Sequence, residues 1–357
     1  MIKTGNFKEL LSILRCPGCK ADGSLEIKDG IHDFNISTPL YQKTIHCEQC
    51  NEHYPITDDL IPIMWSENLK RVYSDIHQNQ DLNNNVIDAS SNLLANIKVY
   101  SDVSTDYSRY TRQSSVIGNR IGNSVKRIFP DNKTEGLLHL DFACGPGHVQ
   151  KWLQPFGFKQ IGLDVSLANL RNARKRTGSS VICGDACNMP FADDTFDLVT
   201  ESSALHHILD WKSAVTESCR ICRDRGGLIM DSEPSDLHLD WSPLAAAVFN
   251  ARFPFYKVLS YFVKDKYFFR NTEQAKLAKL NLQTEVHHQP GTGIPLDILK
   301  STLKNSGFKV QIIVSPTSEL NSCANPNWKS IVLNLLSARN PWNPNYGNFM
   351  AIGRPAV

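Results

Sequence analysis

From Leu137 to the C-terminus, short apolar runs alternate with stretches whose apolar residues recur at helical spacing. The first five runs are residues 137–143, 159–164, 181–185, 196–200 and 227–231. Runs of this length indicate buried strands, and the stretches between them indicate amphipathic helices. Such alternation is typical of a parallel sheet with helices on both faces. We therefore expect an α/β fold with a doubly wound sheet in residues 137–357.

Two long segments interrupt this alternation. Residues 235–295 follow the fifth expected strand and are rich in aromatic and basic residues. Insertions at this position form substrate lids in such folds, so we expect a lid. The alternative is a helical cap whose aromatic side chains only pack on the core. Residues 315–347, with an expected helix at 328–339, separate the last two expected strands, 308–314 and 348–353. They are expected to wall the pocket or to form a contact in a homo-oligomer.

Two Cys-x-x-Cys pairs mark residues 1–66 as a separate module. The pairs are formed by Cys16, Cys19, Cys47 and Cys50. Each pair can sit on a tight turn that points two sulfur atoms at one ion. Four thiolates make the closed tetrahedral set of a structural Zn²⁺. We therefore expect a zinc ribbon, with Asp29–Gly30 as the turn of a hairpin between the pairs. Unpaired thiols or disulfides are the alternative.

Length and composition fit a soluble protein with a catalytic core and an accessory module. The chain has 357 residues, of which 41% are hydrophobic, and a formal net charge of +2. This charge predicts no strong attraction to nucleic acid or membranes. No signal peptide and no apolar run long enough to span a membrane is visible. Ten cysteines are too sparse for a disulfide scaffold, so we expect a reducing compartment, the cytoplasm.

Glycine and acidic residues follow the expected strands at their carboxyl ends. The turn Cys144–Gly147 comes after the first strand, where glycines let the backbone approach a ligand closely. The third glycine of a dinucleotide fingerprint is missing, because Gln150 stands in its place, and this argues against NAD. Asp164 ends the second strand, 23 residues after Asp141, and Asp185 ends the third. A carboxylate at the position of Asp164 can accept both hydroxyls of a ribose.

This series resembles the motifs of class I S-adenosylmethionine-dependent methyltransferases. The matching motifs are Leu140-Asp-x-x-Cys-Gly-x-Gly147, Gly162-x-Asp-x-Ser166, Gly184-Asp-Ala, Met189-Pro-Phe, Phe196-Asp-Leu-Val and Leu205-His-His. The closest group is the small-molecule branch that includes quinone C-methyltransferases. The resemblance covers residues 100–234 densely and 296–357 loosely. It implies a Rossmann-like, seven-stranded sheet, methyltransferase activity and S-adenosylmethionine as the cofactor. One departure is Arg223-Asp-Arg-Gly-Gly, where the family usually has a basic residue, proline and two glycines.

Residues 7–65 resemble a second family, the small zinc-ribbon domain of the activator subunit of eukaryotic tRNA and protein methyltransferases. The resemblance rests on the cysteine pairs and their flanks, Phe7–Arg15 and Tyr54–Met64. The loop between the pairs is long for that family. A structural Zn²⁺ is what this second resemblance also implies.

The methyltransferase resemblance assigns roles around the methionine and ribose of the cofactor. Gly145 and Gly147 would cradle the methionine part, and Asp141 would hold its ammonium group directly or through water. Asp164 would bind the ribose. Ser202 lies in the segment that, in family members, runs close to the sulfonium group of the cofactor.

The resemblance also places the adenine. Val165 would pack on the ring, while Asp185 and Ala186 would read its edge. Tyr107 lies in residues 67–136, which we expect to form a helical linker and helices that cap the cofactor. The alternative for Tyr107 is a partly buried aromatic on an amphipathic helix. The full set of expected cofactor-binding residues is Asp141, Cys144, Gly145, Gly147, Asp164, Val165, Asp185, Ala186, Ser202 and Tyr107.

Histidines are the candidates for catalysis. Methyl transfer is an in-line displacement, so positioning supplies much of the rate, and a nucleophile that carries a proton also needs a base. His206 and His207 follow the fourth strand, and His288 lies on a Gly/Pro-rich loop at the expected mouth. Histidine titrates in the useful range. The alternative is that these side chains cap or pack.

The leading interpretation is methyl transfer to a small-molecule acceptor. The aromatic insert and the near-neutral charge favour it. An RNA methyltransferase is one alternative, although phosphate contacts would demand a basic face. A non-catalytic zinc-ribbon scaffold is the other, and the intact acidic and glycine motifs disfavour it.

Overall fold

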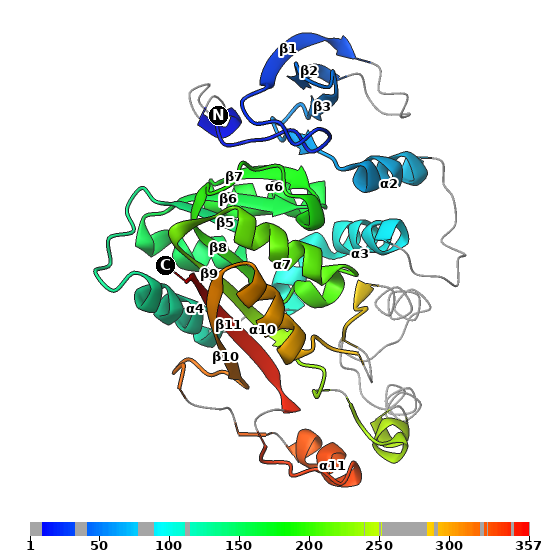
Figure 1. The fold of residues 1–357 in the computed structure, drawn as a ribbon. Coiled ribbons are helices and arrows are strands. Elements are labelled where there is room, and N and C mark those ends of the chain that lie inside the picture. Colours follow the sequence, from blue (N-terminus) through cyan, green and yellow to red (C-terminus); the bar gives the residue numbers. More distant parts are fainter. Residues whose placement is uncertain are drawn as a thin grey trace.

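The described residues form two β-sheets in the computed structural model (Figure 1). A three-stranded sheet has the order β1-β2-β3, and an eight-stranded sheet has the order β10-β11-β9-β8-β5-β6-β7-β4. The structure describes residues 9–32, 41–77, 89–110, 115–238, 240–249, 251, 284–288, 292–321, 325–326, 328–343 and 346–356.

The large sheet is mainly parallel. Its central strands are β7 (Ser180–Gly184), β6 (Lys159–Asp164), β5 (Leu138–Phe142), β8 (Phe196–Ser202) and β9 (Cys222–Pro234). At one edge β11 (Asn348–Pro355) runs antiparallel to both β9 and β10 (Phe308–Val314). The order reverses direction at β5, from which the chain steps first toward β6 and β7 and then back to β8. The expected α/β fold is confirmed.

Helices cover both faces of the large sheet. Neighbouring residues of a strand point to opposite faces, so one strand contributes to the core on each side. Leu198 of β8 packs in a core with α4 (Ser115–Ile128) and α5 (His148–Leu153). Val199 packs in the other core, to which α7 and α10 contribute. Figure 1 shows α7 and α10 together on one face of the sheet. The bounds of the remaining helices of the core are α6 Leu167–Thr177, α7 Trp211–Arg220, α10 Leu296–Asn305, η1 Gln154–Phe156, η2 Ala186–Asn188 and η3 Leu205–His207.

Residues 67–136 contain two further helices, α2 (Glu67–His77) and α3 (Ala89–Tyr110), and then α4. Both α2 and α3 pack on the core through buried apolar side chains, among them Leu69 and Leu94. They lie side by side (Figure 1).

The three-stranded sheet corrects one expectation. Its strands are β1 (Leu25–His32), β2 (Tyr41–Cys47) and β3 (His53–Ile56), all antiparallel. Asp29 lies within β1 and pairs with Lys43 of β2, so the expected hairpin turn at Asp29–Gly30 is wrong. The register shifts between Asp29 and His32, which indicates that the glycine sits at a bulge rather than at a turn.

The N-terminal region adds an eighth strand to the large sheet. β4 (Ile63–Met64) pairs in parallel with β7, Ile63 opposite Cys183 and Met64 opposite Gly184. The resemblance implied seven strands. A two-residue strand leaves no periodic signal in the sequence, yet it covers an edge that would otherwise expose unpaired backbone groups.

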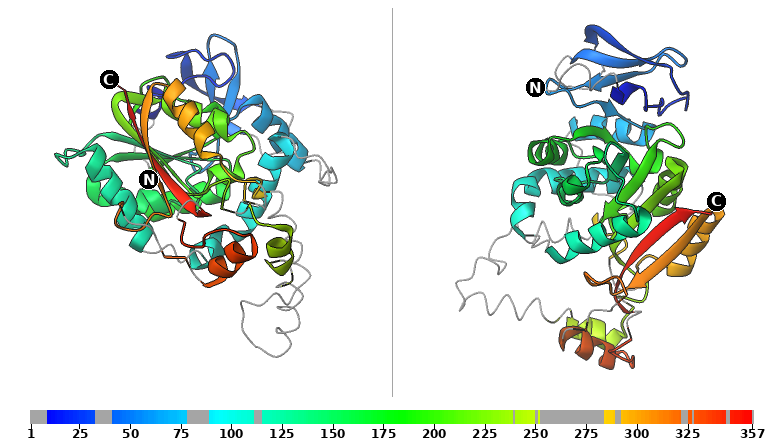
Figure 2. Two further views of the ribbon diagram at one scale, coloured as in Figure 1. Left: turned by 60° about the horizontal axis from the view of Figure 1, so that its bottom comes forward. Right: turned by 90° about the vertical axis from the view of Figure 1, so that its left-hand side faces the viewer.

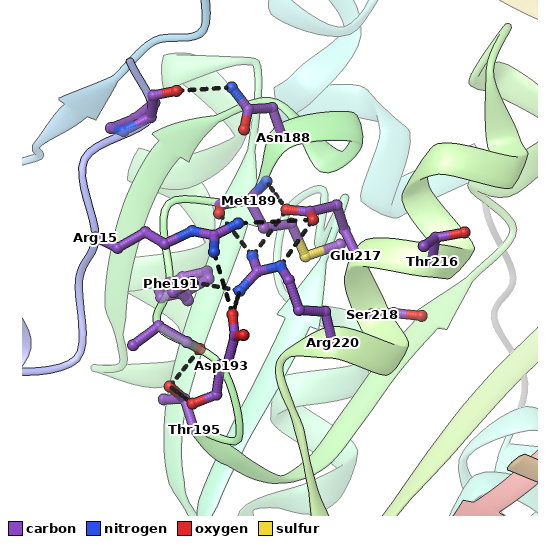
Figure 3. A network of polar contacts seen from close by, with 12 residues as sticks. Arg15, Asn188, Met189, Phe191, Asp193, Thr195, Thr216, Glu217, Ser218 and Arg220 are labelled. Atoms are coloured by element: carbon purple, nitrogen blue, oxygen red, sulfur yellow. Dashed lines mark hydrogen bonds and ion pairs between the residues drawn. The ribbon is translucent and has the colours of Figure 1, made fainter. Parts of the chain in front are cut away.

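An ion-pair network fixes the first cysteine pair to the core (Figure 3). Arg15, which precedes Cys16, contacts Asp193 at 3.1 Å. Arg220 of α7 reaches the same carboxylate at 2.6 Å and also pairs with Glu217 at 2.8 Å. The backbone N–H of Arg15 donates to the carbonyl of Pro190. The N-terminal module is therefore seated on the segment that follows β7.

The two inserts are described to different extents. The expected helix at 328–339 is confirmed as α11 (Trp328–Leu336), which ends three residues earlier than expected. Most of the expected lid falls on residues 252–283, which lie outside the described residues. No helix among the described residues is long and apolar enough to cross a membrane.

Candidate cofactor site and active site

A pocket opens at the carboxyl ends of β5, β6, β7 and β8, where the strand order reverses. Open α/β sheets bind ligands at this position. The pocket is lined by Asn92, Leu93, Asn96, Tyr100, Asp141, Ala143, Cys144, Gly145, Pro146, His148, Val149, Leu163, Asp164, Val165, Asn169, Gly184, Asp185, Ala186, Ser202, Ser203, Ala204, His207 and Ile208. The structure thus brings together eight of the ten expected cofactor residues. Gly147 lies beside this lining, and the side chain of Tyr107 falls outside the described residues.

The turn after β5 is built for a close backbone approach. Ala143, Gly145 and Gly147 all have positive φ angles, of 48°, 50° and 79°. An added Cβ at Gly145 would meet no atom within 4 Å, so this glycine faces open space in the pocket lining. An added Cβ at Gly147 would lie 3.0 Å from Ala173 of α6. Gly145 therefore leaves room for a ligand, whereas Gly147 allows α5 to pack against α6.

Asp141 is buried at the floor of the pocket. Its Oδ1 accepts from the hydroxyl of Thr200 at 3.1 Å, and its Oδ2 is buried with no hydrogen-bond partner in the protein. Burial, followed by the nearby charge of Asp164, raises the pKa of Asp141 to about 8. A cationic ligand group at Oδ2 would satisfy the orphan oxygen and restore the charged form.

Asp164 is held rigidly at the end of β6. Its Oδ2 accepts from the backbone N–H of Gly145, and its Oδ1 from that of Ser166, both at 2.8 Å. Burial raises the pKa of Asp164 and these backbone N–H groups oppose the rise. Each oxygen keeps a further lone pair, so the carboxylate can still accept from ligand hydroxyls.

The N-terminal region supports the next acid, Asp185. The hydroxyl of Ser66, two residues after β4, donates to its Oδ2 at 3.0 Å, and the N–H of Cys187 donates to Oδ1 at 2.8 Å. Tyr73 of α2 donates to the carbonyl of Val165 at 3.0 Å. The predicted adenine-binding residues are thus backed by side chains from outside the core.

A polar stripe on α3 forms the opposite end of the pocket. Asn92, Asn96 and Tyr100 are spaced by four residues and therefore share one face of the helix. Asn96 donates to the carbonyl of His207 at 3.1 Å, and Asn92 accepts from the N–H of Leu209 at 3.3 Å. These two hydrogen bonds fix α3 against the loop that follows β8.

The geometry fixes the tautomer of His207. Its Nδ1 lies 3.1 Å from the carbonyl of Thr284, which can only accept, so Nδ1 carries the proton. Its Nε2 therefore accepts from the hydroxyl of Tyr100 at 3.0 Å. Burial, and then the charge of His206, lowers the pKa of His207 well below its usual value. His207 is a neutral imidazole in the pocket wall.

His206 points to a buried carboxylate instead. Its Nδ1 lies 3.0 Å from Glu233, which also accepts from the backbone N–H groups of Ala204, Leu205 and His206 itself. Burial lowers the pKa of His206, but the charge of Glu233 outweighs this and raises it. His206 is absent from the pocket lining.

His288 lies behind His206, with ring centroids 5.2 Å apart. Burial, and then the charge of His206, lowers its pKa to about 4. The structure therefore brings the three candidate histidines together, but His207 alone among them lines the pocket.

Sequence reasoning missed Ser66, Tyr73, Asn92, Asn96 and Tyr100. The polar stripe on α3 was visible as three polar residues at every fourth position in an apolar stretch. Ser66 and Tyr73 left no such signal, because their role depends on how the N-terminal region packs on β7.

The expected metal ligands come together at one point. The four sulfur atoms of Cys16, Cys19, Cys47 and Cys50 lie within 4.8 Å of one another. The Sγ atoms of Cys16 and Cys50 are 3.5 Å apart, and those of Cys19 and Cys47 are 3.6 Å apart. Tetrahedral Zn–S bonds of about 2.3 Å require sulfur separations of about 3.8 Å. Among the described residues, these four are the only group with metal-site geometry. The cluster is compatible with a structural Zn²⁺.

Comparisons with known proteins find similarity to methyltransferases. Residues 140–230 match the family described as methyltransferase domain. A demethylmenaquinone methyltransferase of Thermobifida fusca is 36% identical over 118 residues, 30% of this chain and 50% of that protein. A malonyl-acyl-carrier-protein O-methyltransferase of Legionella pneumophila is 32% identical over 124 residues, 33% of this chain and 41% of that protein. The chain therefore spans half or less of the length of these two relatives.

A solved chain from a complex that contains the Haloferax volcanii Trm112 methyltransferase activator also aligns. It has a TM-score of 0.44 and 15% identity, and the alignment covers 72% of this chain and 98% of that chain.

The fold and the pocket define an α/β domain with a pocket at a topological switch point. The family match identifies residues 140–230 as a methyltransferase domain, and the resemblance to class I S-adenosylmethionine-dependent methyltransferases is confirmed.

Proposed function

We propose that the chain is an S-adenosylmethionine-dependent methyltransferase that acts on a small-molecule acceptor. The observation that carries this proposal is the convergence of Asp141, Asp164 and Asp185, from successive strand ends, on one pocket with an open glycine turn. The names of the relatives, a demethylmenaquinone and a malonyl-acyl-carrier-protein methyltransferase, support an acceptor of small size.

In this proposal the expected cofactor residues keep their roles. Asp141 holds the ammonium group, since its Oδ2 has no other partner. Gly145 admits the methionine backbone, and Asp164 takes the ribose hydroxyls with its remaining lone pairs. Val165 packs on the adenine, and Asp185 with Ala186 lies at its edge.

We assign the candidate histidines different parts in catalysis. When bound, S-adenosylmethionine would supply an electrophilic methyl group to the acceptor. His207 stays neutral, and its Nε2 accepts from the hydroxyl of Tyr100 and so orients the Tyr100 oxygen toward the acceptor. The carbonyl of Thr284 fixes this tautomer by accepting from Nδ1–H. His206 positions His207 from behind, and His288 packs on His206.

The proposal includes the organisation of the chain. It comprises a zinc ribbon in residues 1–66 with Zn²⁺ on its four cysteines, helices in 67–136 and a methyltransferase core in 137–357. A reducing, cytoplasmic location is part of it, and the described cysteines, none of which is in a disulfide, are consistent with it.

Calorimetry with S-adenosylmethionine tests the function first. We expect one saturable site per chain in the wild type and strongly reduced affinity in Asp141→Asn, which keeps the shape but removes the charge. A folded wild type that binds no S-adenosylmethionine would refute the proposal. Formation of S-adenosylhomocysteine with metabolite fractions, and not with RNA, would support a small acceptor.

A further inference from the structure

Two polar side chains lie in the apolar core beside Asp141. They are His139 of β5 and Thr200 of β8, and both are fully buried. β5 and β8 are the two central strands of the large sheet, which has helices on both faces (Figure 2). The His139 ring lies 5.7 Å from the ring of Phe158, which belongs to the core with α4 and α5. Polar groups in such a core lower stability unless they form hydrogen bonds, so the partners of this pair decide what it does.

The two side chains form a hydrogen-bond chain that ends at Asp141. Nε2 of His139 lies 2.8 Å from the hydroxyl oxygen of Thr200, and this hydroxyl donates to Oδ1 of Asp141 at 3.1 Å. Because the single hydroxyl proton of Thr200 points to Asp141, His139 must donate through Nε2–H. Burial lowers the pKa of His139 to about 3, so the imidazole is neutral and carries its one proton at Nε2. Both donors of the chain therefore point toward the carboxylate.

This contact differs from those of other buried hydroxyl groups in the core. Ser124 and Ser218 donate to carbonyl groups four and three residues earlier in their own helices. Thr200 instead reaches across the sheet, where it stands opposite Asp141 in the pairing of β5 with β8. Its hydrogen bond therefore links the core to a side chain that lines the pocket.

The chain affects both the direction and the charge of the Asp141 carboxylate. The last torsion of an aspartate side chain is broad, so a hydrogen bond to one oxygen is needed to fix the direction of the other. With Oδ1 bonded to Thr200, the direction of Oδ2 is set, and this oxygen has no partner in the protein. Burial raises the pKa of Asp141 to about 8, and the hydrogen bond from Thr200 opposes this rise. The chain therefore favours the charged form.

We propose that His139 and Thr200 are positioning residues that aim Asp141 at the ammonium group of the bound cofactor. This inference rests on the proposed function, because it takes S-adenosylmethionine as the ligand. Neither residue lines the pocket, so both act through Asp141 and not by touching the ligand. Thr200 bonds to the carboxylate, and His139 fixes the Thr200 hydroxyl by donating to its oxygen. A charged oxygen with a fixed direction binds an ammonium group more tightly than one that must first be oriented.

Calorimetry of the full-length protein with three ligands tests this inference. S-Adenosylmethionine and its decarboxylated form both carry the ammonium group, whereas 5′-methylthioadenosine lacks it. Thr200→Val keeps the shape of the side chain without its hydroxyl, so it should weaken binding of the first two ligands about tenfold and leave the third unchanged. Thr200→Ser, which retains a hydroxyl, should recover most of the lost affinity.

His139→Leu tests the first link of the chain. It should weaken binding of the two ammonium ligands less than Thr200→Val does, because the Thr200 hydroxyl still reaches Asp141. Combined with Thr200→Val, it should cause no further loss, because His139 acts through Thr200. Additive losses in the double variant would overturn the role of His139.

Thr195→Val is the matched control. Thr195 is also buried, and its hydroxyl donates to the carbonyl of Ala192 at 2.7 Å, outside the pocket lining. Thermal unfolding checks that both valine variants fold, and His139→Leu carries the same ligand comparison if Thr200→Val does not. Equal affinity of wild type and Thr200→Val for S-adenosylmethionine would overturn this inference and leave the proposed function intact. So would a parallel loss for all three ligands, which would indicate a general structural role. A folded wild type that binds none of the ligands would overturn both.

Discussion

The two ends of the cofactor pocket are built in different ways. At the end where we propose that the adenosine binds, called the adenosine end below, Asp164 and Asp185 stand at the ends of adjacent parallel strands. Backbone N–H groups of the residues that follow or face them fix both carboxylates. At the other end, His207 depends on Tyr100 from α3 and on Thr284, which are 107 and 77 residues away in sequence. A repeating fold therefore specifies the first end, whereas long-range packing specifies the second.

The N-terminal region, which here means the described residues up to the end of α2, contacts the adenosine end of the pocket. Through Ser66 and Tyr73 it reaches Asp185 and Val165, and through Arg15 it is tied to the segment after β7. A change far from the pocket can therefore reach the adenosine end, while the end with His207 should remain unaffected.

Removal of the proposed Zn²⁺ is expected to have the largest effect. Cys47→Ser should abolish stoichiometric zinc and unfold the N-terminal module, because structural Zn²⁺ in small modules contributes about 10–16 kcal/mol. Cofactor binding should weaken but persist, since Asp141 and Asp164 belong to the core. Elemental analysis and calorimetry measure the two effects. Cys219→Ser, a buried cysteine outside the cluster, is the control. Purified wild type without zinc and with these cysteines in disulfides would show that the assignment is wrong.

The next largest effect concerns the end with His207. His207→Gln should lower kcat by ~10²-fold with an accepting metabolite, because Tyr100 loses the nitrogen that orients its hydroxyl toward the acceptor. Affinity for S-adenosylmethionine should change little. His238→Gln, whose ring contacts the carbonyl of Tyr346, is the control. Parallel losses of kcat and cofactor affinity would instead indicate a structural role. If His206→Gln alone lowers kcat, the assignment of the two histidines must be exchanged.

The sequence predicted the adenosine end of the pocket better than the end with His207. The first end follows from the repeating fold, whereas the second depends on long-range packing. Apolar periodicity located β6 and β10 with their bounds as observed, and the acids that follow the strands were expected to meet because carboxyl ends of parallel strands share one edge. Periodicity carries no information on which side chains meet across long separations. It therefore could not distinguish His206, held by Glu233, from His207, which faces the pocket. It also placed a turn at Asp29–Gly30, where pairing with β2 keeps the strand extended.

A third effect tests the adenosine end directly. Asp164→Ala should weaken S-adenosylmethionine binding roughly ten- to a hundredfold, since a hydrogen bond to a charged acceptor contributes about 1.5–3 kcal/mol. Calorimetry measures this, with Asp224→Ala as the control, an exposed residue of β9 between the paired residues Cys222 and Gly227. Unchanged affinity in Asp164→Ala would mean that the ribose lies elsewhere.

The smallest effect tests whether the N-terminal region contributes to the adenosine end. Ser66→Ala removes the hydroxyl that donates to Asp185 at 3.0 Å and that accepts from the N–H of Leu69 at 3.3 Å. One neutral hydrogen bond contributes about 1 kcal/mol, so affinity for S-adenosylmethionine should fall about fivefold while kcat stays unchanged.

Ser124→Ala is the matched control for this variant. Ser124 is equally buried and donates to the carbonyl of Arg120, but it does not line the pocket. Both variants should lose similar thermal stability, and only Ser66→Ala should lose affinity. Equal affinity in the two variants would show that the N-terminal region does not contribute to cofactor binding. Asp185 would then be positioned by the core alone, through the N–H of Cys187.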